Sequence, residues 1–323
     1  MVGVVTLRNF GGPEQLAYEE AEVASPAAGE VRIRQRAVGL NYTDVYSRMG
    51  RPGMQAPLIL GAEGAGDVVA LGAGVTAFKV GDRVAYTGGL GAYAEERNYP
   101  ADRLVRIPDN MSYELAAAIM LKGLTAWYLI RKTYEVKPGT VLLLHAAAGG
   151  VGLILAQWAA HLGATVIGTV GSPEKARLAE AHGCRHTILY RDEDFVARVK
   201  EITKGALCHV VYDGVGKTTY PGSIECLRPR GMFVAFGNAS GPIENFDFNA
   251  LGPKGGLFAT RPMLPWYVQT RDELLEGANE LFRVVENGTV KVAINHRYAL
   301  REVAQAHRDL EGRRTTGSAI LLP

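Results

Sequence analysis

A glycine-rich segment between an apolar run and an amphipathic run has the residue spacing of a phosphate-binding turn. The segment reads Ala147-x-Gly149-x-x-Gly152, and Val141-Leu-Leu-Leu144 before it is apolar enough for a buried strand. Glycines let such a turn close against a phosphate, and the following helix start supplies free N–H groups and partial positive charge. The context predicts a dinucleotide site. Because alanine replaces the first glycine, the alternative is a glycine turn that only joins packed elements.

The end of the next apolar run bears on which dinucleotide binds. An NAD site normally carries an acidic residue about 20 residues beyond the fingerprint, where it bonds the ribose hydroxyls. Here the run ends in Val170-Gly171-Ser172 without an acid. The Ser172 hydroxyl can donate to a 2′-phosphate, and Lys175 or Arg177 can offer it a positive charge. We therefore expect NADPH. The alternative is that Ser172 only caps the next helix and Lys175 is a surface lysine.

The elements around this turn alternate between strand and helix through the middle of the chain. Apolar residues on one helical face follow the turn, and Gly163 is placed to end that helix. Ser172-Pro173 predicts the N-cap and first position of a helix that runs to Ala181. Further helices are expected at 193–204 and 218–227. The predicted strands are 141–144, 165–170, 187–190, 209–212, 232–236 and 257–260. This alternation predicts a doubly wound, six-stranded parallel sheet of the Rossmann type.

The first third of the chain has a different pattern. Val31–Val38 alternates apolar and basic residues, as a half-exposed strand does, and Lys79–Tyr86 holds a Gly-Asp turn between strand-like arms. A helix signal begins at Ser112 and leads to 121–134, which should connect two domains. The last residues, 290–323, return to strand and helix signals and should fold back onto the first domain. We expect one mostly antiparallel β domain, 1–122 with 262–323, and one nucleotide-binding domain, 123–261.

Composition excludes several classes of protein. The formal net charge of the 323 residues is +2, which gives no support to a nucleic-acid partner. Three widely spaced cysteines, Cys184, Cys208 and Cys226, fit a reducing compartment, so we expect a cytoplasmic protein. The segment 140–172 has no Asp, Glu, Lys or Arg, but its glycines and changing periodicity favour buried parallel strands over a membrane span.

Several motifs, in order along the chain, resemble the medium-chain dehydrogenase/reductase family. The resemblance is strongest to its zinc-free branch, the NADPH:quinone oxidoreductase or zeta-crystallin-like group. It implies a Rossmann domain that binds NADPH and a GroES-like catalytic domain. The motifs are Gly39-Leu-Asn-Tyr-Thr-Asp44, Gly61-Ala-Glu-Gly-Ala-Gly66, Gly81-Asp-Arg-Val84, Leu121-Lys-Gly-Leu-Thr-Ala126, His145–Gly152, Val211-Tyr-Asp-Gly-Val-Gly216, Phe236-Gly-Asn238 and Thr315-Thr-Gly-Ser318.

Two positions of the resemblance bear on a metal. Zinc-dependent relatives bind catalytic zinc through a cysteine and a histidine, and the matching positions here are Asn41 and Ala62. Neither an amide nor a methyl group replaces a thiolate or an imidazole as a zinc ligand. The four-cysteine structural zinc lobe is also missing, because no cysteine precedes Cys184. We therefore expect no metal and chemistry that does not pass through a zinc-bound alkoxide.

The resemblance also implies the site residues. Asn41 and Tyr46 match residues that line the nicotinamide and the quinone. Asp44 either shares that catalytic role or serves only as a turn aspartate. Arg313 matches a phosphate-contacting arginine, although Arg314 beside it makes the match ambiguous. With the fingerprint residues, the expected cofactor contacts are Asn41, Thr125, Ala147, Gly149, Gly150, Val151, Gly171, Ser172, Lys175, Tyr190, Phe236, Gly237, Asn238, Ser240, Phe258, Thr260 and Arg313.

The expected reaction is hydride delivery from NADPH to an acceptor that is already electron-poor, such as a quinone. An α,β-unsaturated carbonyl fits almost as well, so a 2-alkenal or enone reductase is the alternative. A third possibility is a non-catalytic nucleotide-binding protein, since the zeta-crystallin group includes lens structural proteins and RNA binders. Members of this branch are often homodimers joined at an edge strand of the nucleotide domain, for which Leu257–Thr260 is the candidate.

Overall fold

The computed structural model describes residues 1–323 and divides into two compact units. Unit 1 comprises Met1–Leu124, Val268–Phe282 and Val292–Pro323, and unit 2 comprises Thr125–Tyr267 and Arg283–Lys291. The chain passes from unit 1 to unit 2 inside helix α2 (Tyr113–Tyr128). The domain boundaries expected from the sequence stay a prediction, because compactness does not show which segments fold independently.

Unit 2 is built on a six-stranded sheet in the order β11-β10-β9-β12-β13-β14, and every neighbouring pair is parallel. This confirms the doubly wound parallel sheet. The strands β9 and β12 lie at its centre and are almost entirely buried, as parallel strands covered on both faces are. The strands are β9 (Val141–Leu144), β10 (Thr165–Val170), β11 (His186–Leu189), β12 (Cys208–Asp213), β13 (Leu227–Ala235) and β14 (Phe258–Thr260).

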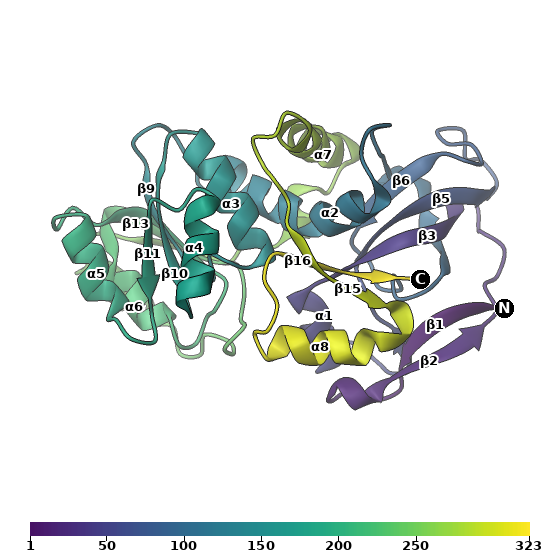
Figure 1. Ribbon diagram of the computed structural model, residues 1–323, viewed down its shortest axis with the longest axis horizontal. Helices are drawn as coiled ribbons and strands as arrows, with labels where there is room; N and C mark the ends of the chain where they lie inside the picture. The colour runs from purple at the N-terminus through teal and green to yellow at the C-terminus, as the bar shows by residue number, and fades with distance from the viewer. The chain divides into compact units, whose positions relative to one another are not determined.

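Helices cover both faces of this sheet. Figure 1 shows α3 (Gly150–His161) and α4 (Pro173–Ala181) on one face, and α5 (Phe195–Ile202) and α6 (Tyr220–Glu225) on the other. The helix α4 has the bounds that its Ser-Pro start predicts, and its N-cap Oγ accepts from the Lys175 N–H at 3.4 Å. Shorter helical turns are Leu129–Thr133, Phe248–Leu251 and Leu264–Tyr267.

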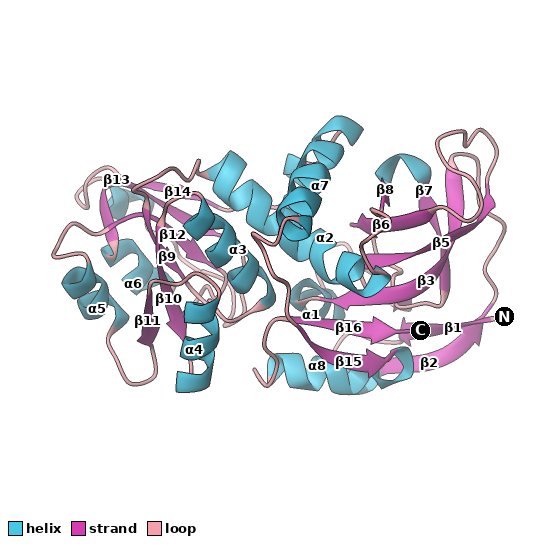
Figure 2. Ribbon diagram, turned by 45° about the horizontal axis from the view of Figure 1, so that its top comes forward, coloured by secondary structure: helices cyan, strands magenta, loops and turns pink.

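Unit 1 is mostly antiparallel. Its larger sheet runs β15-β16-β3-β5-β6-β8, with β7 also paired to β3, and only β15 and β16 are parallel (Figure 2). A smaller sheet runs β2-β1-β4. The strands are β1 (Val2–Leu7), β2 (Leu16–Ala21), β3 (Glu30–Leu40), β4 (Leu58–Ile59), β5 (Glu63–Leu71), β6 (Arg83–Thr87), β7 (Glu96–Pro100), β8 (Val105–Arg106), β15 (Ile294–Ala299) and β16 (Ser318–Leu322).

Two short helices lie wholly within unit 1. They are α1 (Tyr42–Arg48) and α8 (Val303–Glu311), with helical turns at Pro13–Gln15, Ala101–Arg103 and Leu300–Glu302. A longer helix, α7 (Arg271–Glu286), begins in unit 1 and ends in unit 2. The pairing of β16 with β3 confirms that the C-terminal segment returns to the first domain. None of the helices combines the length and apolar character that crossing a bilayer requires.

Two local predictions in unit 1 have different outcomes. The half-exposed strand is confirmed, because Val31 and Ile33 are buried while the basic side chains of β3 face acids, Arg34 to Glu96 and Arg36 to Asp67. The prediction of a strand-like arm before the Gly-Asp turn is wrong. Residues 79–82 form a turn in which the Asp82 carboxylate accepts from the Lys79 N–H at 2.9 Å, and β6 begins only at Arg83.

Candidate active site

The glycine fingerprint lies between β9 and α3, at the carboxyl edge of the unit 2 sheet. Gly149 is the N-cap of α3, and Gly150 and Val151 form its first turn. No side chain caps this helix, whereas Ser172 caps α4. The first N–H groups of α3 therefore remain available to an anion at the positive end of the helix.

Missing side chains let the fingerprint turn pack closely. A Cβ on Gly152 would lie 2.5 Å from the Ala146 carbonyl oxygen and 2.7 Å from that of Ala147, so only glycine fits there. The fully buried Ala147 takes the first fingerprint position. Its methyl group is accommodated because Gly168 on β10 has no side chain; a Cβ there would lie 2.7 Å from that methyl. The alanine that departs from the usual fingerprint is thus compensated on the neighbouring strand.

The residues expected near a 2′-phosphate gather where β10 and β11 end. Gly171 directly follows β10, and a Cβ on it would lie 2.9 Å from the Tyr190 hydroxyl oxygen. Ser172 and Lys175 occupy the N-cap and first turn of α4. The capping role foreseen as an alternative for Ser172 is therefore present. A hydroxyl that accepts a hydrogen bond from the main chain can still donate its own proton to a phosphate oxygen.

Residues after β13 form the next part of the same edge. Phe236 lies against Gly214. In the amide orientation that satisfies both of its polar atoms, the Asn238 side chain donates to the Gly237 carbonyl and accepts from Arg261, both at 2.9 Å. The Ser240 hydroxyl donates to the Val215 carbonyl at 2.8 Å. On β14, Thr260 is half-buried and Phe258 is 57% exposed. Thr125 lies in α2, where it is 9% exposed.

Two residues of this edge were missed by sequence reasoning. The buried Asp213 carboxylate at the end of β12 accepts from the N–H groups of Val215 and Gly216 at 2.8 and 2.9 Å, and from the Ser223 hydroxyl at 2.9 Å. It thereby fixes the glycine loop after β12. Arg261 directly follows β14 and donates to the Ala235 carbonyl at 2.8 Å. An ionisable residue directly after a strand of a parallel sheet was the available signal in both cases.

His145 has partners on both ring nitrogens. Nδ1 lies 2.8 Å from the Thr169 hydroxyl, and Nε2 lies 3.0 Å from the Ser223 hydroxyl, which itself donates to Asp213. Burial lowers the pKa of His145, opposed by the nearby Asp213 charge. The ring is fully enclosed, so the geometry favours a structural histidine over a general base.

In unit 1, the Glu63 carboxylate gathers the polar groups around Asn41. The Asn41 side-chain nitrogen donates to Oε2 at 2.7 Å, the Leu121 N–H donates to Oε1 at 2.6 Å, and the Lys122 ammonium lies 3.5 Å from Oε2. Glu63 is fully buried. A Cβ on Gly39 would lie 2.1 Å from Glu63 Oε2, so Gly39 provides the space for this carboxylate. Glu63 belongs to the Gly61–Gly66 motif, but the sequence alone predicted no role for it.

The helix α1 carries the other two residues expected on the acceptor side. The Tyr46 ring packs edge-on against the Tyr42 ring, with 5.2 Å between the ring centroids. The Tyr46 side chain is half-buried. Asp44 Oδ2 accepts from the Asn41 N–H at 2.9 Å and from the Tyr93 hydroxyl at 3.0 Å, while Oδ1 has no hydrogen-bond partner. Asp44 therefore has the loop-bonding contact foreseen as one alternative, and a role toward an acceptor stays a prediction.

The last expected contact lies after α8. Arg313 is exposed and adopts a left-handed backbone conformation, φ 57°. Arg314 forms an ion pair with Asp309 at 2.7 Å. The choice between Arg313 and Arg314 as a phosphate contact stays a prediction.

The donor set does not fit a catalytic zinc ion. Asn41 presents an amide that is already bonded to Glu63, and Ala62 has no donor atom. Nowhere in residues 1–323 do three or more His, Cys, Asp or Glu side chains gather as a metal site would require. Zinc sites need three or four such ligands within bonding distance.

A parallel nucleotide sheet with an uncapped fingerprint helix, joined to a mostly antiparallel unit, defines a dinucleotide-dependent dehydrogenase or reductase. Two family models match: the alcohol dehydrogenase GroES-like domain over residues 27–109 and the zinc-binding dehydrogenase over residues 150–258. The quinone oxidoreductase of Pseudomonas aeruginosa is 53% identical over 316 residues, covering 97% of each chain. The chain belongs to the medium-chain dehydrogenase/reductase family, in its quinone oxidoreductase branch.

Two further comparisons extend this result. A solved structure of the Escherichia coli quinone oxidoreductase in complex with NADPH has a TM-score of 0.98 and 46% identity, covering 99% of this chain and 100% of that one. A 2-haloacrylate reductase from a Burkholderia species is 46% identical over 333 residues, covering 100% of this chain and 99% of that protein. Both the fold class and the family expected from the sequence are confirmed.

The buried Asp44 generates a prediction for stability against pH. Burial raises the pKa of Asp44 to about 7 from its ordinary 3.8. Between these values the folded protein holds a proton that the unfolded chain releases, so rising pH lowers the free energy of unfolding. Asp44→Asn has no such proton to lose. The free energy of unfolding of Asp44→Asn, relative to that of wild type, should therefore rise by about 1.4 kcal/mol for each unit of pH between these two pKa values.

Urea unfolding of Asp44→Asn and wild type between pH 5 and 7 measures this difference. Asp109→Asn, at an exposed aspartate of the same unit, is the matched control. An Asp44→Asn difference that stays constant over this range would contradict the neutral, proton-bearing state of Asp44.

Proposed function

We propose that this protein is an NADPH-dependent, zinc-independent quinone oxidoreductase. The observation that carries the proposal is 53% identity to a quinone oxidoreductase along nearly the whole chain. The solved relative in complex with NADPH supports the choice of cofactor. When bound, NADPH supplies a hydride; a quinone that takes up this hydride and one proton becomes a hydroquinone, and NADP⁺ is released.

The cofactor residues are proposed in three groups. The free N–H groups at the start of α3 support a role for the fingerprint turn in holding the pyrophosphate. Ser172 and Lys175 hold the 2′-phosphate, with Tyr190 beside the adenosine and Arg313 as a further phosphate contact. The residues proposed for the nicotinamide end are Thr125, Phe236, Gly237, Asn238, Ser240, Phe258 and Thr260, together with Asn41 and the newly found Arg261.

Asn41, Tyr46 and Asp44 are proposed as the acceptor-side residues. Because Glu63 holds the Asn41 amide at 2.7 Å, this side chain has a fixed orientation in which it can bond an acceptor carbonyl. Tyr46 can stack on a quinone ring or donate a hydrogen bond. A quinone needs no Lewis acid to accept a hydride, which agrees with a donor set that does not fit zinc.

An alkene conjugated to a carbonyl or carboxyl group is the second candidate acceptor. The specific observation in its favour is the 46% identity to a 2-haloacrylate reductase over essentially the whole chain. The hydride from NADPH would then add to a carbon of the conjugated alkene instead of reducing a quinone. We rank it second because the quinone oxidoreductase of Pseudomonas aeruginosa is more similar to this chain.

An acceptor panel distinguishes these candidates. With NADPH, we expect steady-state turnover with 1,4-benzoquinone and 1,2-naphthoquinone, and much lower kcat/KM with 2-alkenals and 2-haloacrylates. NADPH oxidation with an alkenal or haloacrylate but with neither quinone would contradict quinone reduction and establish the second candidate. A reaction run without protein controls for direct reduction of the quinones by NADPH.

The choice of NADPH over NADH predicts the effect of Lys175→Ala. Removing the ammonium group should raise the Kd for NADPH about tenfold and leave that for NADH nearly unchanged, because only NADPH carries the 2′-phosphate. Titration of intrinsic fluorescence measures both constants. Lys200→Ala, at an exposed lysine of α5 in the same unit, is the control. Equal weakening for both nucleotides, or no change for either, would contradict the specificity assigned to Lys175.

We also propose a cytoplasmic homodimer joined at β14. The three cysteines are free and buried, which suits a reducing compartment. The strand β14 is the edge of the unit 2 sheet, and large aromatic side chains in this part of the unit are exposed, Phe248 by 76%, Phe258 by 57% and Trp266 by 67%. Light scattering should give twice the chain mass of 34.7 kDa. A mass equal to one chain would contradict the dimer.

A further inference from the structure

A row of buried polar side chains runs from the end of α1, through His307 of α8 and Tyr93, back to Asp44 in the first turn of α1. Arg48 Nη1 lies 3.1 Å from His307 Nδ1, and His307 Nε2 lies 3.0 Å from the Tyr93 hydroxyl oxygen. That hydroxyl lies 3.0 Å from Asp44 Oδ2. Arg48 is 1% exposed, and His307, Tyr93 and Asp44 are fully buried. Nothing in the proposed chemistry uses Arg48, His307 or Tyr93.

Every hydrogen bond of this row has one permitted direction. A guanidinium group only donates, so His307 Nδ1 must accept from Arg48. Burial, together with the Arg48 charge, lowers the pKa of His307 to about 3, so its ring is neutral and carries its single proton on Nε2. His307 therefore donates to Tyr93, whose own proton is left to be donated to Asp44.

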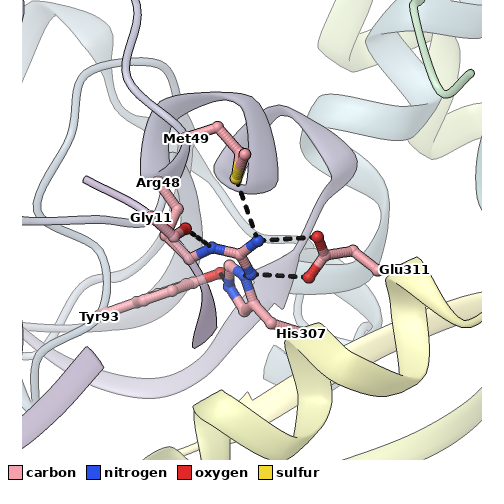
Figure 3. A network of polar contacts seen from close by, with 6 residues as sticks. All are labelled: Gly11, Arg48, Met49, Tyr93, His307 and Glu311. Carbon is pink, nitrogen blue, oxygen red and sulfur yellow. Dashed lines mark hydrogen bonds and ion pairs between the residues drawn. The ribbon is translucent and has the colours of Figure 1, made fainter. Parts of the chain in front are cut away.

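Both ends of the row are held in place. The Arg48 guanidinium donates to the two Glu311 carboxylate oxygens at 2.7 Å and to the Gly11 carbonyl at 2.9 Å, as Figure 3 shows. This bidentate pair fixes the plane of the guanidinium group. At the other end, Asp44 Oδ2 also accepts from the Asn41 N–H at 2.9 Å.

The middle of the row depends on a glycine of the Gly61–Gly66 motif. A Cβ on Gly61 would lie 2.4 Å from the Tyr93 ring, and the φ of Gly61 is +85°. The ring therefore packs directly against the main chain of the short segment between β4 and β5. The Tyr93 hydroxyl is thereby kept in line with Asp44.

We propose that His307 and Tyr93 are positioning residues, whose one-directional hydrogen bonds fix Asp44 and, through it, the main chain of Asn41. The inference rests on the proposed function, which assigns Asn41 to the acceptor. The row cannot carry a proton from Glu311, because the Arg48 guanidinium stays protonated at every pH at which proteins are folded. It acts by orientation, and a small displacement of a group that orients a substrate has a large effect on rate.

The test compares two buried tyrosines of the same unit. Tyr93→Phe removes only the hydroxyl that bonds Asp44. Tyr99→Phe is the matched control, because Tyr99 is 4% exposed and its hydroxyl donates to main-chain carbonyls, Gly88 at 2.9 Å among them. We expect Tyr93→Phe to lower kcat/KM for the quinone about tenfold, with the Kd for NADPH within about twofold of wild type. Tyr99→Phe should leave both values unchanged.

Variants of His307 test the same row from its other side. His307→Gln retains one acceptor and one donor and should keep most of the activity, whereas His307→Phe removes both and should resemble Tyr93→Phe. The double variant Tyr93→Phe/His307→Phe should lose no more than either single variant, because both break one row. If His307→Phe does not fold, Tyr93→Phe and His307→Gln still carry the test. Additive losses, or equal losses in Tyr93→Phe and Tyr99→Phe, would overturn the proposal.

A second readout does not depend on turnover. Four groups face Asp44. The Asn41 N–H, the Tyr93 hydroxyl and the Lys122 charge lower the pKa of Asp44, and the Glu63 charge raises it. Tyr93→Phe removes one lowering contact and should raise the pKa of Asp44 in carbon-13 aspartate spectra, with Asp44→Asn assigning the signal.

The two readouts separate the possible failures. Wild-type protein that reduces no quinone would contradict the proposed function, while the carbon-13 titration would still test the row. An Asp44 titration unchanged in Tyr93→Phe, or full quinone reductase activity in that variant, would overturn the positioning role.

Discussion

The Glu63 carboxylate is the interaction on which the acceptor side of this protein depends. It is fully buried and accepts from Asn41 and from the Leu121 N–H, with Lys122 as its nearby cation. Removing it would leave buried donors unpaired, at a cost of about 1–3 kcal/mol for each neutral group. The N-cap of α1, the first residue of β5 and the middle of α2 are therefore held in one arrangement, and Gly39 supplies the space in which they meet.

Unit 2 uses the same device at its nucleotide edge. The Asp213 carboxylate ends the buried strand β12 and accepts from two main-chain N–H groups and two hydroxyls. Side-chain packing cannot cover the main chain of a loop on the side from which a ligand must reach it. Buried carboxylates provide the alternative, since a charged acceptor binds several N–H and O–H groups in a defined geometry. In unit 1 this group holds Asn41, which we assign to the acceptor. In unit 2 it fixes the loop after β12, where the Val215 carbonyl accepts from the Ser240 hydroxyl.

The sequence predicted the parts of this structure that depend on neighbouring residues. The bounds of β9, β10 and α4 follow from local periodicity and turn chemistry, and Ser172 and Pro173 define the start of α4 without any tertiary contact. The strand expected before the Gly-Asp turn was wrong because its arm is only two residues long, and the Asp82 side chain stabilises a turn there instead.

Two buried residues for which the sequence predicted no role, Glu63 and His307, have partners far along the chain. Glu63 bonds groups at positions 41 and 121, and His307 lies 259 residues from Arg48. No local pattern identifies such partners, and the compensation between Ala147 and Gly168 likewise exists only between strands. In contrast, the family resemblance pointed to Asn41 and Asp44 because those residues belong to a short continuous motif.

In the proposed reaction, NADPH delivers a hydride directly to a quinone. Rapid mixing under anaerobic conditions, with NADPH deuterated at either face of nicotinamide C4, tests it in a single turnover. We expect the absorbance of the reduced nicotinamide to be lost only when quinone is present, and deuterium to slow the reaction only when it is on one of the two faces. Oxidation of NADPH in the absence of quinone would contradict direct hydride transfer. Equal rates for unlabelled NADPH and both deuterated forms, under conditions in which hydride transfer limits the rate, would also contradict it.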